Sequence, residues 1–275
     1  MGNFKFGINM GAITADFEKK PADVLRGLSQ IGYKGIEITY PLPLPIDEFN
    51  SLTKELDIVP ISLHAASPGN DDEINKMIDF VQSINCERIV FGSYHPDNLK
   101  SADHYKSQAE LFNKTGEKCK KRGIQAFYHN HHWEFKKFDG KYGLDIMMEE
   151  TKPDWVQFEI DVCWLTVGGA DPSVYIRKNE KRCRLIHYKD IFIKDGFARD
   201  GHAKDGIIEE DGYSLKEGSY ALTEAGTGVV DFKKIREIVN PQYVDWLISE
   251  QDNSTLPPME TARINFENYK RLGVI

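Results

Sequence analysis

The sequence alternates strand-like and helix-like segments from end to end, and this alternation constrains the fold more than any other feature. Each predicted strand is a short apolar run that ends before a segment with helical spacing. The eight predicted strands cover residues 4–9, 35–39, 59–64, 88–91, 124–130, 156–161, 184–189 and 246–250. Because parallel strands need a crossover connection, usually a helix, the alternation predicts a parallel sheet.

The segments between the strands carry helix signals. In the first of them, apolar residues recur at helical spacing from Val24 to Ile31 and stop at Gly32, a residue typical of helix C-termini. The other predicted helices span 46–56, 71–84, 102–122, 142–151, 172–179, 231–239 and 259–272. Eight such repeats in 275 residues predict a single-domain (β/α)₈ TIM barrel over residues 1–275.

A doubly wound open sheet is the alternative fold. It would usually show a glycine-rich phosphate loop after an early strand, and neither GxGxxG nor GxxxxGK[ST] is present. One segment does not fit a plain barrel: residues 190–228 are rich in Gly, Asp, Glu and Lys and are too long for an ordinary loop. We expect this segment to be a lid over a site or a contact arm for a partner.

Composition narrows the function classes. The net charge of −8 gives no electrostatic reason to expect nucleic acid as a partner. No apolar run approaches the roughly 20 residues of a membrane helix, and the N-terminal segment lacks the apolar region of a signal peptide. Four cysteines without a CxxC pair are typical of a reducing compartment. We therefore expect a cytoplasmic protein that does not enter a membrane.

The segment 127–134 contains three histidines within four residues, directly after the fifth predicted strand. In a strand, His129 and His131 share one face, and Asn130 and His132 lie off it. Two imidazoles at a strand end suit a metal or a polar substrate, and Glu134 adds a carboxylate nearby. The alternative is a solvated, histidine-rich loop.

Polar residues end six of the predicted strands, which a barrel would bring together on one face. They are Glu37, His64, His129 with His131, Asp161, His187 with Lys189, and Glu250. Asp161, His187 and Glu250 follow three consecutive strands and predict a divalent metal site. Taken singly, Asp161 could cap the next loop, His187 could be a core histidine, and Glu250 could pair with Lys189.

The same segments resemble a known family. The matching stretches are 159–164, 171–172, 186–190, 226–232 and 249–252. Their ordered series Asp, His-x-Lys-Asp, Gly-x-Gly and Glu is similar to that of the xylose-isomerase-like TIM barrels. This superfamily contains sugar isomerases and epimerases, inosose dehydratases and apurinic-site endonucleases of the AP endonuclease 2 type.

The resemblance implies one divalent metal held by one ligand from each of strands five to eight. Asp161, His187 and Glu250 match three of these ligands. The family's strand-five ligand is a glutamate, and His129 stands at its place here, with His131 as the alternative ligand. Mn²⁺ is the expected ion, with Co²⁺, Zn²⁺, Fe²⁺ and Mg²⁺ as alternatives. Because family epimerases use paired glutamates as acid and base, the histidine leaves the two-carboxylate mechanism open.

The resemblance also implies the reaction, a sugar isomerisation or epimerisation in which a proton moves next to a carbonyl through an enediolate. Glu250, His131 and Lys189 are the candidate proton carriers. Glu37 and His64 are expected to bind sugar hydroxyls, and Trp133, Trp164 and Phe91 form either an apolar wall for the sugar or ordinary core.

Other reactions stay open. The main alternative is a dehydratase or lyase acting on an inosose, a 3-keto-sugar or a keto-glycoside at the same metal site. Phosphodiester cleavage and a non-catalytic sugar-binding barrel are further alternatives. The expected partner is a small sugar, and analogy with the family also implies a homo-oligomer.

Overall fold

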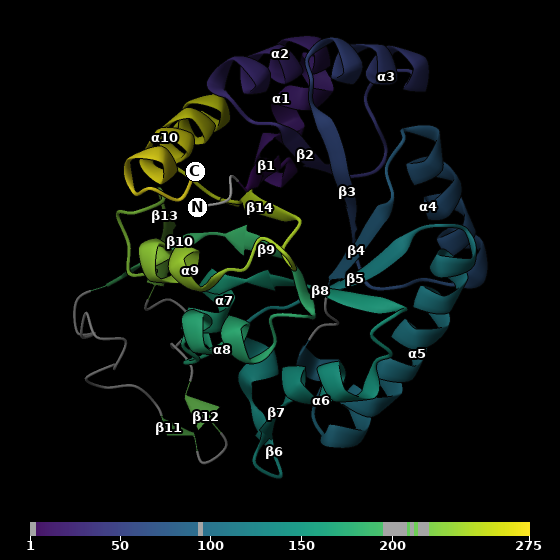
Figure 1. Ribbon diagram of the computed structural model, residues 1–275, viewed down its shortest axis with the longest axis vertical. Helices are drawn as coiled ribbons and strands as arrows, with labels where there is room; N and C mark the ends of the chain where they lie inside the picture. The colour runs from purple at the N-terminus through teal and green to yellow at the C-terminus, as the bar shows by residue number, and fades with distance from the viewer. Residues whose placement is uncertain (1–3, 93–95, 195–207, 210–211, 214–219) are drawn as a thin grey trace.

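The computed structural model describes residues 4–92, 96–194, 208–209, 212–213 and 220–275. Eight parallel strands close into a barrel in the order β1-β14-β9-β8-β5-β4-β3-β2 (Figure 1). They are β1 Lys5–Asn9, β2 Gly35–Ile38, β3 Val59–Ala65, β4 Arg88–Gly92, β5 Gln125–His129, β8 Val156–Asp161, β9 Cys183–Tyr188 and β14 Trp246–Ser249. The predicted barrel is confirmed, and closure of the sheet rules out the open-sheet alternative.

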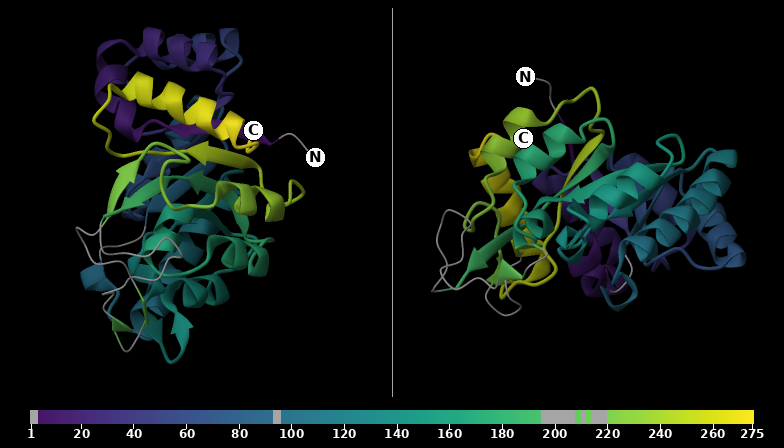
Figure 2. Two further views of the ribbon diagram at one scale, coloured as in Figure 1. Left: turned by 90° about the vertical axis from the view of Figure 1, so that its left-hand side faces the viewer. Right: turned by 90° about the horizontal axis from the view of Figure 1, so that it is seen from below.

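Helices surround the barrel on the outside (Figure 1). They are α2 Pro21–Ile31, α3 Ile46–Glu55, α4 Asp71–Ser83, α5 Ala102–Lys121, α6 Gly143–Glu150, α8 Pro172–Lys178, α9 Phe232–Ile238 and α10 Pro258–Arg271. The last helix, α10, packs beside α2, so the two ends of the chain close the ring (Figure 2). Local signals fix several helix ends: Asn70 and Glu73 form a capping box on α4, and α2 ends at Gly32 with φ 121°.

The barrel also has short helices and strands that were not predicted from the sequence. They are η1 Gly11–Ile13, α1 Thr14–Lys19, η2 Pro96–Asn98, η3 Trp133–Phe135, α7 Val162–Val167, and the strand pairs β6 Lys137–Phe138 with β7 Lys141–Tyr142 and β11 Ile208–Glu209 with β12 Gly212–Tyr213. They are too short to carry a periodic apolar pattern, which explains why the pattern did not predict them.

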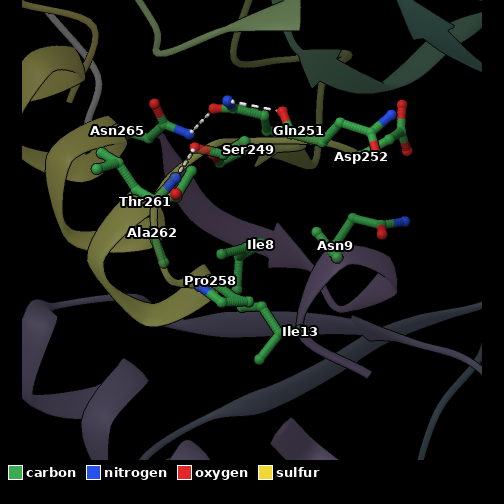
Figure 3. Close-up of a pocket in the computed structure, with 14 residues that line it drawn as sticks. Ile8, Asn9, Ile13, Ser249, Gln251, Asp252, Pro258, Thr261, Ala262 and Asn265 are labelled. Carbon is green, nitrogen blue, oxygen red and sulfur yellow. Dashed lines mark hydrogen bonds between the residues drawn. The ribbon is translucent and has the colours of Figure 1, made fainter. Parts of the chain in front are cut away.

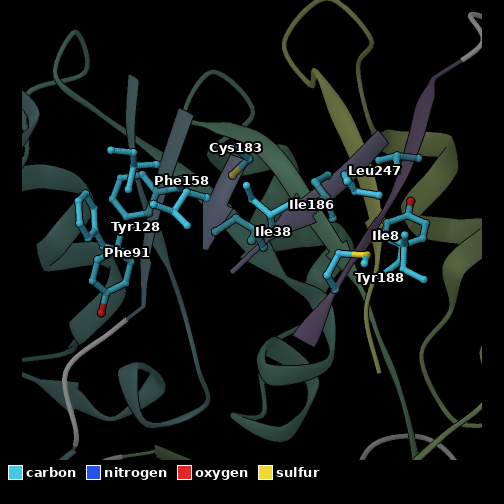
Figure 4. Close-up of a cluster of buried hydrophobic side chains, with 14 of the residues drawn as sticks. Ile8, Ile38, Phe91, Tyr128, Phe158, Cys183, Ile186, Tyr188 and Leu247 are labelled. Atoms are coloured by element: carbon cyan, nitrogen blue, oxygen red, sulfur yellow. The ribbon is translucent and has the colours of Figure 1, made fainter. Parts of the chain in front are cut away.

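The larger core lies between the barrel and the helices. Strand side chains that point outward, such as Phe91, Tyr128, Phe158 and Leu247, belong to this layer and are fully buried (Figure 4). Phe91 lies 6.1 Å from the ring of Phe112 on α5. Of the three aromatic residues considered for a sugar-facing wall, Phe91 is therefore a residue of this core.

A second, smaller core fills the inside of the barrel. It is a cluster of Ile61, Val90, Phe127, Leu185, Trp246 and Ile248, which we call the apolar layer. Two glycines make room for its bulky members: a Cβ on Gly7 would collide with Ile61 Cδ1, and one on Gly35 would lie 2.8 Å from Trp246. Large side chains opposite glycines fill the inside of the barrel at this layer, which is therefore a packed core and not a pore.

The long segment after β9 begins and ends as a strand pair. β10 Asp190–Ile193 pairs antiparallel with β13 Tyr220–Thr223. The Asp190 carboxylate accepts hydrogen bonds from the backbone N–H groups of Gly226, Gly228 and Val230, at 2.8 to 3.1 Å. A Cβ on Gly228 would collide with the backbone oxygen of Ile191, so this approach requires glycine. Most of the segment between the two strands lies outside the described residues, and with it the expected lid or contact arm.

In the part of the chain that the structure describes, no helix is both long enough and apolar enough to cross a membrane.

Candidate metal centre

The side chains that point into the barrel change from apolar to polar toward the carboxyl ends of the strands. Two residues beyond the apolar layer, His129 follows Phe127, His187 follows Leu185, and Glu250 follows Ile248. Because side chains two residues apart in a strand share a face, these polar groups lie directly above the apolar layer. This end of the barrel is where TIM-barrel enzymes build their active sites.

The four residues predicted as metal ligands come together there. One ligand atom from each of His129, Asp161, His187 and Glu250 lies within 4.8 Å of the others, and all four residues are buried. A second group meets the same criterion and shares His129 and His187 with the first. It adds the half-buried His64 on β3 and the buried Glu159 on β8.

Hydrogen bonds join the two groups. His187 Nε2 lies 2.9 Å from Glu37 Oε1 and 3.1 Å from Glu159 Oε2, and His129 Nδ1 lies 2.9 Å from Glu159 Oε2. Glu37 is ionised and accepts, so His187 Nε2 carries a proton. The other ring nitrogen of His187, Nδ1, lies 2.8 Å from Glu250 Oε2, so His187 contacts carboxylates on both sides of its ring. The group of His129, Asp161, His187 and Glu250 is the one predicted from the sequence, and Glu159 and Glu37 contact its two imidazoles.

Glu37 is fully buried and engaged on both oxygens. Its Oε1 accepts from Asn9 Nδ2 at 2.7 Å and lies 3.0 Å from His64 Nδ1, and its Oε2 accepts from the Ser62 hydroxyl at 2.5 Å. Burial works against its charge, but His187 and His64 lower the pKa of Glu37 well below its usual range. Burial and the charge of Glu37 raise the pKa of Glu159 to about 8. At neutral pH one carboxylate of the pair is ionised and the other holds a proton.

The ligand set fits a divalent metal by its chemistry. Two imidazoles with two carboxylates suit transition-metal ions and zinc. The buried Asp161 Oδ2 accepts no hydrogen bond from the described residues and has one ion-pair contact, with Lys189 Nζ at 3.2 Å. Its other oxygen, Oδ1, accepts from Trp164 N at 3.0 Å and caps α7. Asp161 therefore serves as a cap and still presents one oxygen to the site.

Lys189 lies among carboxylates at the same end of the barrel. Its Nζ is 3.2 Å from Asp161, 2.7 Å from Glu250 and 2.9 Å from Asp252, and the side chain is buried. Burial opposes its charge, but these carboxylates outweigh burial and raise the pKa of Lys189 above its ordinary value. The pairing of Glu250 with Lys189, considered from the sequence as an alternative to a metal role, is present.

An aromatic wall borders this charged cluster. The imidazole of His131 stacks on Trp133 with ring centroids 4.3 Å apart and lies 5.9 Å from Trp164. Lys189 Nζ lies 4.8 Å from the centre of the Trp164 ring. Burial and the nearby Lys189 lower the pKa of His131 to about 3, so its imidazole is neutral at physiological pH. Glu134 lies behind the wall and accepts from Tyr128 Oη at 2.9 Å and from the backbone of His131.

Three residues of this centre were not assigned a role from the sequence, namely Asn9, Ser62 and Glu159. Glu159 carried a usable signal, because it precedes Asp161 by two residues in the same strand and must share its inward face. Asn9 and Ser62 gave no such signal. Their contacts depend on the neighbouring strands, where Asn9 and Ser62 both pair in register with Glu37.

The geometry agrees with the comparison to known proteins. The family described as xylose isomerase-like TIM barrel matches residues 25–272. The chain belongs to this family. Curated relatives include an inosose dehydratase of Clostridium tetani, 30% identical over 165 residues that cover 58% of this chain and 52% of that protein. One from Lacticaseibacillus casei is 29% identical over 163 residues, with 58% and 52% covered. The chain thus spans about half the length of these curated relatives.

Solved structures share the fold at low identity. A sugar phosphate isomerase/epimerase from Parabacteroides distasonis has a TM-score of 0.74 at 20% identity, covering 99% of this chain and 95% of that chain. The IolI protein with a bound zinc atom has a TM-score of 0.72 at 14% identity, covering 98% and 97%. An L-ribulose 3-epimerase has a TM-score of 0.67 at 15% identity, covering 99% and 95%. At these identities the likeness establishes the barrel and leaves the reaction open.

Proposed function

We propose that this member of the family is a divalent-metal-dependent sugar isomerase or epimerase. The observation that carries the proposal is the convergence of His129, Asp161, His187 and Glu250, with ligand atoms within 4.8 Å of one another at the end of the barrel where active sites form. Buried carboxylates and imidazoles are costly to keep in a core, so a function is a better explanation for them than packing.

His129, Asp161, His187 and Glu250 would hold the ion. A divalent cation bound there would polarise a sugar carbonyl and stabilise the negative charge that develops on its oxygen as a neighbouring proton leaves. Glu159 and Glu37 contact the two imidazoles and hold them in fixed orientation, as carboxyl groups do for metal-binding histidines elsewhere. The protein thus supplies both the ligands and the support that keeps their donor atoms aimed at one point.

Proton transfer falls to one of the four ligands, Glu250, and to groups around the ligand set. Glu250 is a carboxylate at the mouth of the barrel and is our candidate base. Lys189, an ammonium among three carboxylates, is our candidate proton donor. His131 is neutral and can accept a proton from the sugar or pass one on. Trp133 and Trp164, which lie next to this imidazole, also offer aromatic surface on which a sugar face can pack. His64 is half-buried and can hydrogen-bond a sugar hydroxyl.

A dehydratase or lyase at the same site is the second candidate. Two observations favour it: the curated relatives are named inosose dehydratases, and His129 stands where family epimerases carry a glutamate. In this reaction the base removes the proton next to the carbonyl, and the substituent on the following carbon leaves with its bonding electron pair while Lys189 supplies a proton. Inososes, 3-keto-sugars and keto-glycosides have the required carbonyl.

Two measurements test the proposal. Metal analysis of the purified protein should find one divalent ion per chain, and its absence would overturn the site. Incubation in D₂O with ketoses, inososes and keto-glycosides should then separate the reactions. Deuterium incorporation without loss of a substituent supports the isomerase, and elimination supports the lyase.

Glu250→Gln should slow either reaction about 10²- to 10⁴-fold, the usual contribution of a general base. Glu117→Gln, on the exposed face of α5, is the matched control.

A further inference from the structure

A cavity of about 220 Å³ lies beside the metal centre, between the end of β1, the segment after β14, and helix α10 (Figure 3). Its lining includes Ile8 and Asn9 of β1, Ile13 of η1, and Thr261 and Ala262 of α10. Neither the metal ligands nor the aromatic wall line it. The proposed mechanism therefore does not use this space.

Two residues connect the cavity to the charged centre. Asn9 lines the cavity, and its amide donates to Glu37 Oε1 at 2.7 Å. Asp252 lines it from the other side and accepts from Lys189 Nζ at 2.9 Å, and the same Nζ lies 2.7 Å from Glu250. Through Asn9 and Asp252 the cavity therefore directly adjoins the residues of the charged centre.

The lining has an apolar side and a polar side. Ile13, Pro258 and Ala262 form the apolar side (Figure 3). On the polar side, Asn265 donates to Gln251 Oε1 at 2.9 Å, which fixes both amides in orientation. An aliphatic patch facing rigid amides is suited to a sugar ring, which presents C–H groups on one face and hydroxyls at its edge.

Thr261 supplies the observation that points to a ligand. The residue is 6% exposed and lines the cavity, yet its hydroxyl has no hydrogen-bond partner among the described residues. A buried hydroxyl without a partner costs free energy, so one that faces a cavity is explained by a ligand that pairs with it. No Lys or Arg lines the cavity, and Asp252 does, so a neutral ligand fits better than a phosphate or carboxylate.

We propose that this cavity is the subsite for a second sugar ring, and that the substrate is a glycoside whose reacting sugar lies at the metal centre. The volume of about 220 Å³ is below the range of about 300–1,000 Å³ for whole-ligand pockets. It therefore accommodates one ring and not a complete oligosaccharide. This inference rests on the proposed function, since it assumes that the reacting sugar binds between the metal ligands and the aromatic wall.

Calorimetric titration of the metal-loaded protein with glucose and with cellobiose, maltose and trehalose tests the subsite without measuring turnover. At least one disaccharide should bind about ten-fold more tightly than glucose, a difference of about 1.4 kcal/mol. Ala12 of η1 also lines the cavity, so Ala12→Phe places a ring in it and should remove this advantage. Thr261→Val keeps the side-chain shape and should reduce the advantage about three- to ten-fold, the effect of one hydrogen bond. Val174→Phe, at an exposed position on α8, should change nothing.

The subsite is refuted if every disaccharide binds like glucose, or if Ala12→Phe keeps the advantage in protein with native metal content and melting temperature. The proposed function can fail separately. A disaccharide advantage that depends on Ala12 and Thr261 would support the subsite even if D₂O exchange found no reaction with any ketose. Exchange with a ketose but no disaccharide advantage would support the enzyme and refute the subsite.

Discussion

Two layers of side chains lie inside the barrel, one above the other, and they differ in polarity. The apolar layer contains Phe127, Leu185 and Ile248, and the layer above it contains His129, His187 and Glu250 at positions two residues later. Residues of both layers lie on the same strands, two positions apart. The lower layer lowers the free energy of the fold by removing apolar surface from water, and the upper layer keeps charges out of water at a cost. In this barrel a step of two residues along a strand therefore leads from the apolar core to the proposed metal site.

The largest effect should come from removing a ligand in the upper layer. His187→Ala should lose stoichiometric metal, with affinity falling by more than the roughly 100-fold that supporting residues can cause. The measurement is metal content together with a titration of the apo-protein. His104→Ala, an exposed histidine on α5, is the control. Native metal content in a folded His187→Ala protein would show that the ligand set is misassigned.

A truncation in the lower layer should affect stability and not metal binding. Phe127→Ala leaves a cavity among fully buried side chains and should lower the free energy of unfolding by about 3–5 kcal/mol. Urea denaturation measures this difference. Phe192→Ala removes the same ring from a side chain that is 51% exposed on β10, and it should change stability by at most about 0.5 kcal/mol. A similar loss in both variants would remove the distinction between the apolar layer and the surface.

Glu159 supports the upper layer without belonging to the ligand set. It holds both His129 and His187, so Glu159→Ala should weaken metal binding about 10- to 100-fold. Glu159→Gln keeps an acceptor oxygen and should recover part of the affinity. Competition with a chelator of known affinity measures both. If the alanine variant binds metal as tightly as the native protein, the carboxylate does not orient the histidines.

The smallest effect concerns a carboxylate outside the barrel. Asp171 caps α8, accepts from Lys234 at 2.8 Å and is 45% exposed. Partial burial alone would raise the pKa of Asp171, but hydrogen bonds from Lys234 and Ser173 outweigh it and lower that pKa to about 2. For the fully buried Asp161, burial dominates and raises the pKa to about 6. The same residue type thus shifts in opposite directions in the two environments.

The lowered pKa of Asp171 determines whether its contribution to stability rises or falls with pH. Because the unfolded pKa of an aspartate is about 3.9, the stability that Asp171 contributes is present above that pH and is lost as pH falls toward 2. Solvent screening keeps it at or below about 1 kcal/mol. Asp171→Asn should lower stability at pH 7 and reduce the loss of stability between about pH 4 and pH 2. Unfolding curves across this range measure it, and an unchanged acid slope would contradict the assignment.

The order of residues alone was enough to predict the barrel and three of the four proposed ligands. Alternation of apolar runs and helical spacing is a local property, and so is a polar residue at a strand end, so Asp161, His187 and Glu250 are identifiable from the order of residues alone. Closure of the sheet then brings these ends together, because parallel strands place all their carboxyl ends on one side.

The contacts that support the proposed ligands depend on how the strands are arranged in the barrel. The contacts of Glu37 with Asn9, Ser62 and His187 join four strands, and no local pattern encodes which strands are neighbours. The cavity beside α10 is likewise formed by residues from opposite ends of the chain. Local periodicity places a side chain on a face, but distances between strands fix its protonation, its hydrogen-bond partners and the space that a substrate can enter.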